Sequence, residues 1–567
     1  MSNDEHGDRS GREHHKTATQ QDRLTLRDIW LIVVACAALS AVVAAMAALN
    51  TALAEIAPDI SADSAQITWL VDGYTLTLAA LLLPAGALGD RFGRRGMLLV
   101  GMVVFGIASS LPVFLTDPNL IIGTRCLAGA GAALVMPATL SLITSGVPES
   151  KRPIAVSIWA GVAGAGAIGG FFVTGILLEF FSWHSIFITF AGASALIVVL
   201  ALTIGTSRDE NPPPFDIPGS VASAVAIAAF VFGLIEGPVR GWDDPLVLVA
   251  LVGGLAVAGV FVYLETHREH VLLDVTLFRR RAFGSGAFAI ALQFLGSFGT
   301  FFLILQRLQL VMGYSPLKSA VAMFPLVVVV MVMSLLGNWL AVRFNFRAVL
   351  APGMFVFGLG IVLLGALTYT EYSTIAILLS VMAFGLGIAT APATTAIMVS
   401  TPVENQGVGS AVNDTARELG AAIGMALAGS IVAAGYTARI GATADNARDQ
   451  LQTMGDQLVA GGQQERGQML IAQSDTVGQT IGRSLAEARA VSEQIGQNIP
   501  GRLGADIFDG AQQAFLHPSD QAYIVLGSLV MAGSVLLGFW APNRLDEKAT
   551  GTTVVSAPSD RESDPVG

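Results

Sequence analysis

Residues 86–95 read Gly86-Ala-Leu-Gly-Asp90-Arg91-Phe-Gly93-Arg94-Arg95 and separate two long apolar segments of the chain. Hydrocarbon excludes charge, so an acid and three arginines in so short a link must lie at a membrane surface. The glycines permit a tight turn and a close approach of helices. Because membrane proteins retain arginine on the cytoplasmic side, this stretch predicts a cytoplasmic loop between two membrane-spanning helices.

The composition of the whole chain also indicates a membrane protein. Of its 567 residues 53% are hydrophobic and 13% are charged, whereas a soluble domain carries roughly 25% charged residues. The net charge is −11 and the basic residues gather at the ends of apolar segments, which excludes a nucleic-acid partner. Cys36 and Cys126 both fall within apolar segments, so we expect buried thiols and no disulfide framework.

A helix needs about 20 apolar residues to cross a membrane, and fourteen stretches of this chain meet that requirement. We place these stretches at residues 30–53, 66–88, 96–115, 119–145, 154–178, 184–205, 217–236, 246–264, 283–312, 317–341, 347–368, 374–399, 406–435 and 521–541. The sequence therefore predicts an all-α membrane protein with fourteen transmembrane helices.

The orientation in the membrane follows from the Lys and Arg residues of the short loops. Twelve of them lie on the same side as residues 86–95, and two, Arg240 and Lys318, lie on the opposite side. We therefore expect both termini in the cytoplasm, with the polar residues 1–28 and 542–567 as disordered tails. The three histidines of the first tail are spaced too irregularly for a metal site.

The longest soluble segment, residues 437–520, lies between the last two predicted spans and therefore outside the cell. It is rich in Gln, Ala and Gly, and apolar residues recur in it at roughly helical intervals: Leu451, Met454, Leu458, Met469, Ile481 and Leu485. We expect a loosely packed helical hairpin that serves as a passive connector. A lid or a partner-docking module is the alternative.

The 86–95 stretch matches the pattern G-x-x-x-D-[RK]-x-G-R-[RK] and so resembles the loop between spans two and three of the major facilitator superfamily. Further segments resemble the fourteen-span drug:proton antiporters of that superfamily, the EmrB/QacA type, and particularly its quaternary-ammonium exporters. These segments are Trp69-Leu-Val-Asp72-Gly-Tyr74, Arg125-Cys-Leu-Ala-Gly-Ala-Gly131, Trp183-His-Ser-Ile-Phe187, Gln309-Leu-Val-Met-Gly-Tyr-Ser-Pro316 and Gly409-Ser-Ala-Val-Asn-Asp414-Thr-Ala-Arg-Glu418-Leu-Gly420. The likeness covers residues 30–436 and the last span.

The resemblance implies the major facilitator fold, in which two pseudo-symmetric six-helix bundles rock around a central site. The bundles would be residues 29–205 and 283–541, the second interrupted by the helical insertion 437–520, and residues 206–282 would supply two extra central spans and their linkers. It further implies the bacterial cytoplasmic membrane and no cofactor beyond a proton gradient. Because fourteen spans make a complete transport unit, we expect a monomer surrounded by lipid.

Two positions depart from the resembled family. Ala45 stands where these exporters usually carry an aspartate in span one, which removes one candidate proton or cation site. In span five the family's proline is absent, and the segment reads Ala165-Gly166-Ala-Ile-Gly169-Gly170. Its glycines still permit close helix packing, because Gly166 and Gly170 form a small-residue pair four positions apart.

Ionisable groups within spans cost roughly 2.5–3.5 kcal/mol each to insert, so those present are candidates for function. Asp414 and Glu418 lie one turn apart on one face of span thirteen. Two carboxylates this close resist joint ionisation, so we expect them to share a proton and exchange it between the two sides of the membrane. The alternative is that Asp414 pairs with Arg417 and only Glu418 matters for transport.

Asp72 and Arg125 are the other two candidate proton-coupling or substrate residues. Asp72, roughly 9 Å from the outer face, either meets a cationic substrate or a proton, or is a helix-start acid with its head in the interface. Arg125 is buried by pattern and needs partners; the resemblance implies a role in proton transfer or in bracing the cavity, and a structural ion pair is the alternative. Arg307, near the outer end of span nine, is expected to snorkel to the interface.

The resemblance implies that the 86–95 loop latches the two bundles together on the cytoplasmic side. The latch residues are Gly86, Asp90, Arg91, Gly93, Arg94 and Arg95. A weaker copy of this pattern in the second half, from Gly337 to Arg347, lacks the acid. We therefore expect an asymmetric latch.

These features favour a secondary exporter that uses inward proton flow to expel amphipathic, cationic drugs or toxic compounds by alternating access. Acids within the spans suit lipophilic cations, because a desolvated charge needs a counter-charge. With Ala45 in span one, a dedicated exporter of a neutral or anionic natural product or of a lipid is the alternative.

None of the four lysines follows glycine in a phosphate-binding G-x-x-x-x-G-K-[ST] loop, which excludes an ATP-driven pump in this chain. The spread of the acids through the spans disfavours a membrane enzyme.

Overall fold

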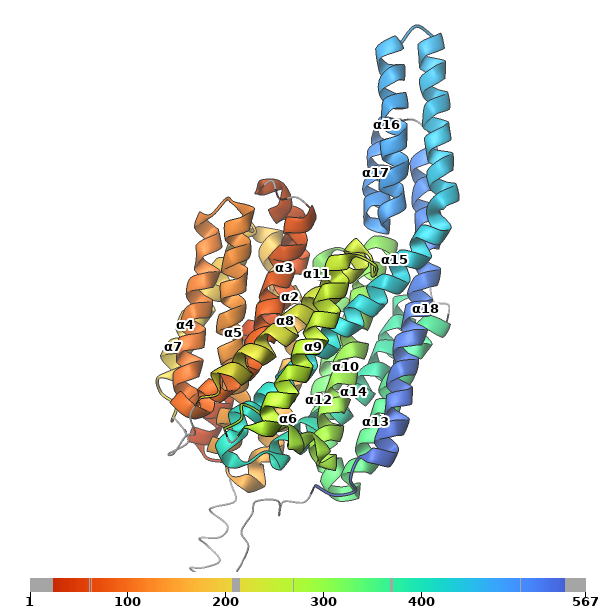
Figure 1. Cartoon of the computed structure of the whole chain (residues 1–567). Helices are drawn as coiled ribbons and strands as arrows, with labels where there is room; N and C mark the ends of the chain where they lie inside the picture. Colours follow the sequence, from red (N-terminus) through yellow and green to blue (C-terminus); the bar gives the residue numbers. More distant parts are fainter. Residues whose placement is uncertain are drawn as a thin grey trace, which may run out of the picture.

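The computed structural model describes residues 24–60, 62, 64–205, 215–268, 270–367, 371–499 and 501–545, and all regular structure in them is helical (Figure 1). The first part of the chain forms α2 (Leu26–Asp59), α3 (Ser64–Phe92), α4 (Arg94–Ser110), α5 (Pro118–Gly146), α6 (Arg152–Phe180), α7 (His184–Ala201), α8 (Ile217–Arg240) and α9 (Pro245–His267). The second part forms α10 (Arg281–Gln306), α11 (Pro316–Ala322), α12 (Phe324–Phe344), α13 (Phe346–Ala366), α14 (Tyr372–Ser400), α15 (Gln406–Ala460), α16 (Gln464–Arg483), α17 (Leu485–Asn498) and α18 (Leu503–Trp540).

The number of membrane spans agrees with the sequence prediction. Among the described residues thirteen helical segments are long and apolar enough to cross a membrane, and counting the bent helix α6 as one further span gives fourteen. The prediction of an all-α, multi-pass membrane protein is therefore confirmed. Residues 1–23 and 546–567 of the predicted tails lie outside the described residues, and α2 begins at Leu26, so residues 26–28 belong to the first helix rather than to a tail.

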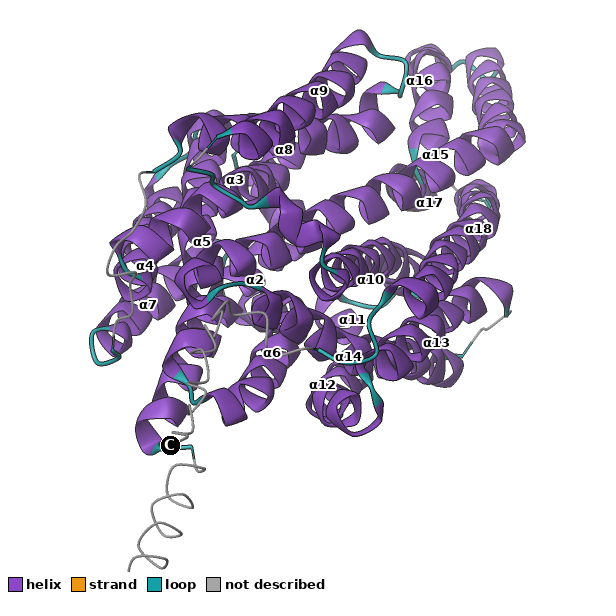
Figure 2. Cartoon of the chain, turned by 60° about the horizontal axis from the view of Figure 1, so that its bottom comes forward, coloured by secondary structure: helices purple, strands orange, loops and turns teal. Residues whose placement is uncertain are grey.

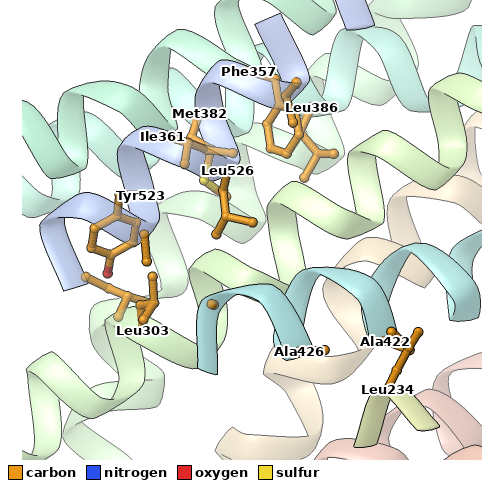
Figure 3. Packing of buried hydrophobic residues seen from close by; sticks show 14 of the residues in the cluster. Leu234, Leu303, Phe357, Ile361, Met382, Leu386, Ala422, Ala426, Tyr523 and Leu526 are labelled. Atoms are coloured by element: carbon orange, nitrogen blue, oxygen red, sulfur yellow. The ribbon is translucent and has the colours of Figure 1, made fainter. Parts of the chain in front are cut away.

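The helices form two hydrophobic cores. One core is built mainly from α2–α7 and buries Leu39, Phe105 and Trp159. The other is built mainly from α8–α18, and Figure 3 shows part of it, with side chains such as Phe357 and Leu526 packed between helices. Figure 2 shows the two groups of helices side by side, with α8 and α9 along one flank.

Helix α8, the first of the two extra spans, touches both groups of helices. The ring of Phe232 on α8 packs against Trp69 of α3, with ring centroids 5.8 Å apart. Trp242, which follows α8, donates its indole N–H to the Ser430 hydroxyl on α15 over 3.0 Å. Helix α9 instead exposes a row of large apolar side chains, the kind of surface that lipid covers.

The segment at residues 437–520 is more extensive than the predicted hairpin. Helix α15 continues without a break from its membrane-spanning part to Ala460, α16 and α17 return along it, and α18 begins at Leu503 before entering the second core. Figure 1 shows these four helical segments projecting beyond the ends of the other spans. Ile481 and Leu485 are buried in it as the helical intervals predicted, whereas Met469 is 62% exposed.

The projecting segment is attached to the end of α10, where residues 307–311 form the π-helical turn η4. Arg489 of α17 donates to the carbonyl oxygens of Gln309 and Leu310, over 2.8 and 3.3 Å. Gln512 of α18 donates to the carbonyl oxygen of Val311 over 3.2 Å. A π-turn leaves carbonyl groups without regular helical partners, and these side chains satisfy them.

Glycine sets the closest approach of α15 to α10. A Cβ atom at Gly420 or Gly424 would collide with the carbonyl oxygens of Ala291 and Leu295 on α10. Only hydrogen at these positions lets the two backbones touch, which is a common way for helices to pack inside membranes.

The glycines of span five follow the same rule in part. A Cβ at Gly170 would collide with the Ala44 backbone on α2, and one at Gly166 would lie 3.1 Å from the Val43 side chain. Nothing lies within 4 Å of the corresponding position at Gly169. Two of the three glycines therefore pack against α2, and the third does not.

We expect the substitution Gly424→Ala to lower the free energy of unfolding by about 1–3 kcal/mol, because the added methyl group overpacks the α10–α15 contact. The matched control is Gly441→Ala, in the same helix but with nothing within 4 Å; alanine should raise helix stability there by up to about 1 kcal/mol. Thermal unfolding of the purified proteins in detergent measures both effects. Equal shifts in the two variants would contradict the close packing of α15 on α10.

Candidate functional site

A central cavity lies between the two groups of helices. Its walls come from α2, α3, α5 and α6 on one side and from α10, α12, α14 and α15 on the other. Aromatic and aliphatic side chains make up most of the wall, among them Met46, Trp159, Phe294, Phe298 and Phe301. The polar groups are few: Ser297, Thr390, Thr394, Arg417 and Glu418. An apolar cavity with a few convergent polar groups is the usual form of a small-molecule site.

Glu418 is the single carboxyl group in the described lining of this cavity. The residue is 6% exposed, and its Oε2 atom has no hydrogen-bond partner among the described residues. Its charged neighbours are Arg417 and Asp414 on the same helix. A buried carboxylate oxygen without a donor is unfavourable, so this position favours a bound proton or a cation.

Asp414 lies behind the cavity wall, where it contacts Arg417. Its Oδ1 atom is 3.5 Å from the guanidinium of Arg417 and accepts a hydrogen bond from the Asn413 amide over 3.2 Å. The guanidinium of Arg417 in turn lies over the rings of Phe294 and Trp159, 4.5 and 5.3 Å from their centroids. Of the two acids, Glu418 is in the described cavity lining and Asp414 is not.

Asp72 is not among the residues that line the cavity. It lies on the side of α3 that faces α8, where Glu236 is its charged neighbour. Glu236 is 6% exposed and forms an ion pair with Arg240 one turn later, over 2.5 Å. Sequence reasoning missed Glu236, although an acid at the end of the predicted span 217–236 was a signal that could have identified it.

Arg125 braces three helices of the first group. Its Nε donates to the Leu70 carbonyl on α3 over 3.0 Å, and Nη2 donates to the Ala45 carbonyl on α2 over 3.2 Å. Its guanidinium also lies 4.6 Å from the ring centroid of Tyr74, whose hydroxyl donates to the Val42 carbonyl. No carboxylate of the described residues lies within salt-bridge distance of Arg125, so backbone carbonyl groups solvate this buried charge.

Ala45 itself is buried inside the first core, 1% exposed. The adjacent residues Val43 and Met46 line the cavity instead. Position 45 is therefore not part of the described cavity wall, which is apolar where α2 contributes to it.

Asp90, at the end of α3, caps the first turn of α15. Its Oδ1 accepts the N–H of Gly407 over 2.8 Å, and its Oδ2 accepts the N–H of Val408 over 3.1 Å. The first N–H groups of a helix lack partners within the helix and carry partial positive charge, so a carboxylate suits this position. This contact joins the first group of helices to the second.

Arg94 and Gly86 complete the contact between the two groups. Arg94 is 3% exposed and donates to Asp90 Oδ1 from Nε and Nη2, over 3.0 and 2.8 Å. Its Nη2 also donates to the Val403 carbonyl of the second group over 3.0 Å. A Cβ at Gly86 would lie 2.5 Å from the Gly407 carbonyl oxygen, so glycine is needed where α3 and α15 cross.

Two other predicted latch residues, Gly93 and Arg95, act within the first group. Gly93 has φ +99°, the left-handed region that glycine tolerates, and forms the turn between α3 and α4. Arg95 donates to the carbonyl groups of Ala201 and Leu202 at the end of α7. The guanidinium of Arg91 lies 5.6 Å from the ring of the following residue. Of the predicted latch residues, Gly86, Asp90 and Arg94 make the contacts between the groups that are described above.

The second half joins the two groups with neutral hydrogen bonds. The Asn338 amide on α12 donates to the Pro153 carbonyl and the Ser157 hydroxyl of α6, each over 2.9 Å. Ser334 donates to the Ser157 carbonyl over 3.0 Å. The polar contacts described here on α12 are uncharged, in contrast to the carboxylate of Asp90.

The structure places Arg307 differently from the position that the sequence predicted. It is buried, 8% exposed, and its Nη1 forms an ion pair with Asp520 of α18 over 3.0 Å. The prediction that Arg307 snorkels to the interface is therefore wrong, because a partner 213 residues away along the chain neutralises it inside the protein. No group of three or more His, Cys, Asp or Glu side chains in the described part of the chain is placed to hold a metal ion.

Comparison with known proteins agrees with this architecture. Residues 33–425 match the family model of the Major Facilitator Superfamily. The chain is 30% identical to the multidrug efflux pump LfrA of Mycolicibacterium smegmatis over 514 residues, 89% of this chain and 95% of that protein. It is 28% identical to the methyl viologen resistance protein SmvA of Salmonella typhimurium over 503 residues, 87% of this chain and 93% of that protein.

A solved structure shares the fold. The human organic anion transporter MFSD10 (TETRAN) superposes with a TM-score of 0.50 at 13% sequence identity, covering 72% of this chain and 94% of that chain. With its helical bundles, its central cavity and the sequence match over residues 33–425, the chain belongs to the major facilitator superfamily, a family of membrane transporters rather than enzymes.

Proposed function

We propose that this protein is a proton-coupled exporter of amphipathic, cationic drugs or toxic compounds. The observation that carries the proposal is Glu418, a buried carboxyl group in the wall of a mostly apolar cavity, with one oxygen that has no hydrogen-bond partner among the described residues. A group in that position is neutralised either by a proton or by a cationic substrate. Competition between the two ligands for one carboxylate couples proton entry to substrate exit.

The cavity wall suits flat, lipophilic cations. Phe294, Phe298 and Phe301 on α10 and Trp159 on α6 offer aromatic faces, which attract cations in addition to burying apolar surface. The relatives agree in kind: one is called a multidrug efflux pump, and another a methyl viologen resistance protein. Export of a neutral or anionic natural product or lipid is the competing function.

Transport would proceed by alternating access between two states of the latch. In the state described, Asp90 and Arg94 hold α3 and α4 against the start of α15, and this side would face the cytoplasm together with both termini. Release of the latch would open the cavity to the cytoplasm, as in other rocking transporters. We place the protein as a monomer in the bacterial cytoplasmic membrane.

Glu418→Gln should abolish proton-driven export, because the amide cannot exchange a proton between the two sides. Efflux of ethidium from cells that express the protein measures this, with and without a protonophore. We expect wild-type efflux to fall to the protonophore level in Glu418→Gln, a loss of at least about tenfold for a removed proton carrier. The matched control Glu371→Gln, at an exposed glutamate, should leave efflux unchanged.

Asp414→Asn separates the two interpretations of the acidic pair. If Asp414 only holds Arg417, the variant should insert in reduced amount, since a buried ion pair that loses one partner costs about 3–5 kcal/mol. The inserted protein should still respond to the protonophore.

Ethidium efflux that is insensitive both to Glu418→Gln and to the protonophore would rule out proton-coupled cation export and favour the competing function.

Asp90→Asn should unlatch the two groups of helices. Replacement of the carboxylate weakens hydrogen bonds worth about 1.5–3 kcal/mol each, so the ratio of the closed to the open state should fall at least about tenfold. The readout is a cysteine at the buried position Ala411, which contacts Gly86, in a background without Cys36 and Cys126. Its labelling by a membrane-impermeant maleimide in inside-out vesicles should rise about tenfold in Asp90→Asn.

The control for this experiment is Arg343→Gln, in the second-half copy of the pattern, where the arginine is exposed. In this variant the cysteine at position 411 should be labelled at the same rate as in the parent protein. A rate in Asp90→Asn that also equals the parent rate would show that the carboxylate does not hold the cytoplasmic side closed.

A further inference from the structure

Two buried carboxyl groups lie together on the latch side of the molecule, apart from both the cavity and the latch. Asp216, which caps α8, is 8% exposed, and Glu265, near the end of α9, is 5% exposed. A Cβ atom built at Gly219 would lie 2.2 Å from Asp216 Oδ2 and 2.4 Å from Glu265 Oε1, so these two oxygens are at most 4.6 Å apart.

The other oxygen of each carboxyl group is satisfied. Asp216 Oδ1 accepts hydrogen bonds from the Arg268 guanidinium over 3.1 Å and from the Gly219 N–H over 3.2 Å. Glu265 Oε2 accepts the N–H of Leu273 over 3.0 Å. Asp216 Oδ2 and Glu265 Oε1 have no donor among the described residues. Within the described part of the chain, one oxygen of each group therefore has only the other group as a neighbour for a hydrogen bond.

A single proton bound between Asp216 and Glu265 would satisfy both of these oxygens. If both groups were ionised, two buried acceptors would stay unpaired and two negative charges would repel each other. One proton between them makes an O–H···O⁻ hydrogen bond, a strong charge-assisted type. The remaining negative charge is then matched by the one guanidinium of Arg268.

The other titratable groups nearby are engaged elsewhere or exposed. His267 at the end of α9 is exposed, and its Nδ1 contacts the Tyr263 carbonyl. His270 is exposed, and Asp274 caps the next helical turn by accepting the N–H and hydroxyl of Thr276. Among the described residues, the charge balance at the site is therefore set by Asp216, Glu265 and Arg268.

We propose that Asp216 and Glu265 bind one proton between them, and that this proton docks the linker at residues 270–280 onto α8 and α9. The linker joins the extra spans to α10, and its Leu272, Leu273 and Leu277 are buried. Its far end reaches α14, where Arg280 donates to the Ser400 carbonyl over 3.3 Å. The shared proton thus connects the extra helices with the latch side of the second group.

The sign of the pH dependence follows from this proton. A site that holds a proton in the docked state stabilises docking at low pH, and that stabilisation is lost as the pH rises past the point where the proton leaves. The two carboxylates then repel, the Leu273 N–H loses its fixed acceptor, and the linker opens more often. The effect depends on these residues alone and is independent of any transported compound.

The test is tryptic cleavage of the linker in the full-length protein, purified and reconstituted into lipid nanodiscs. Arg279, Arg280 and Arg281 supply the cleavage sites. Rates are measured across a pH series and divided by those of a free peptide of residues 270–284, which removes the pH dependence of trypsin. Wild-type cleavage should rise with pH, by up to about tenfold per unit once the proton leaves.

Glu265→Gln should remove the pH dependence, because its amide N–H donates to Asp216 Oδ2 without a titrating proton while its carbonyl still accepts the Leu273 N–H. Asp216→Asn instead places an amide N–H donor opposite Glu265 Oε1. If Glu265→Gln fails to fold, the pH dependence of cleavage is tested in Asp216→Asn. Glu149→Gln, at an exposed glutamate on the same side, should follow the wild-type curve. A flat wild-type curve, or variants that follow the wild-type curve, would overturn the shared proton.

Infrared spectroscopy gives a second measurement. It compares wild type with a variant at neutral pH, so it does not require the variant to stay folded at high pH. At neutral pH the spectrum of Glu265→Gln subtracted from that of wild type should contain the carbonyl band of a protonated carboxyl group. Absence of this band from the difference spectrum would likewise overturn the proposal.

Discussion

The carboxylate of Asp90 on the N-terminus of α15 is the contact on which the closed arrangement of the two groups of helices depends. It combines three physical effects. Helix capping satisfies the N–H groups of Gly407 and Val408, the glycine at position 86 permits the close crossing, and Arg94 neutralises the acid. Gly86 lets the helices come close enough for the capping hydrogen bonds, so these bonds break together when the helices separate, whereas the Asp90–Arg94 pair lies within the first group.

Helix α15 connects this contact to the cavity and to the projecting segment. It runs unbroken from Gln406 to Ala460, and Glu418 lies on it about 16 Å beyond the capped turn by helical rise. Further along, Gly424 packs directly on the α10 backbone, and the last turns form part of the projecting segment. A change at the latch therefore acts on one rigid element that also holds the cavity carboxyl, so no separate relay between them is needed.

The sequence predicted what depends on local composition and missed what depends on distant partners. Apolar runs of about 20 residues are legible without any tertiary information, and the fourteen spans followed from them. The same sequence did not reveal that Arg307 is paired with Asp520, or that Asp72 faces Glu236. The projecting segment was underestimated because nothing in residues 436–460 stops a helix, and α15 simply continues.

Several acids of the membrane-spanning part have an arginine beside them. Lipid makes each unpaired charge expensive, so an acid with a fixed structural role is expected to have a permanent cation beside it. Such pairs are Asp90 with Arg94, Glu236 with Arg240, Asp414 with Arg417 and Asp520 with Arg307. Among the described residues, Glu418, Asp414 and the Asp216–Glu265 pair each retain a carboxyl oxygen without a donor, although Asp414 and Asp216 also have an arginine beside them. Since a proton is a ligand that can neutralise such an oxygen and leave again, these oxygens are where we expect protonation to affect the protein.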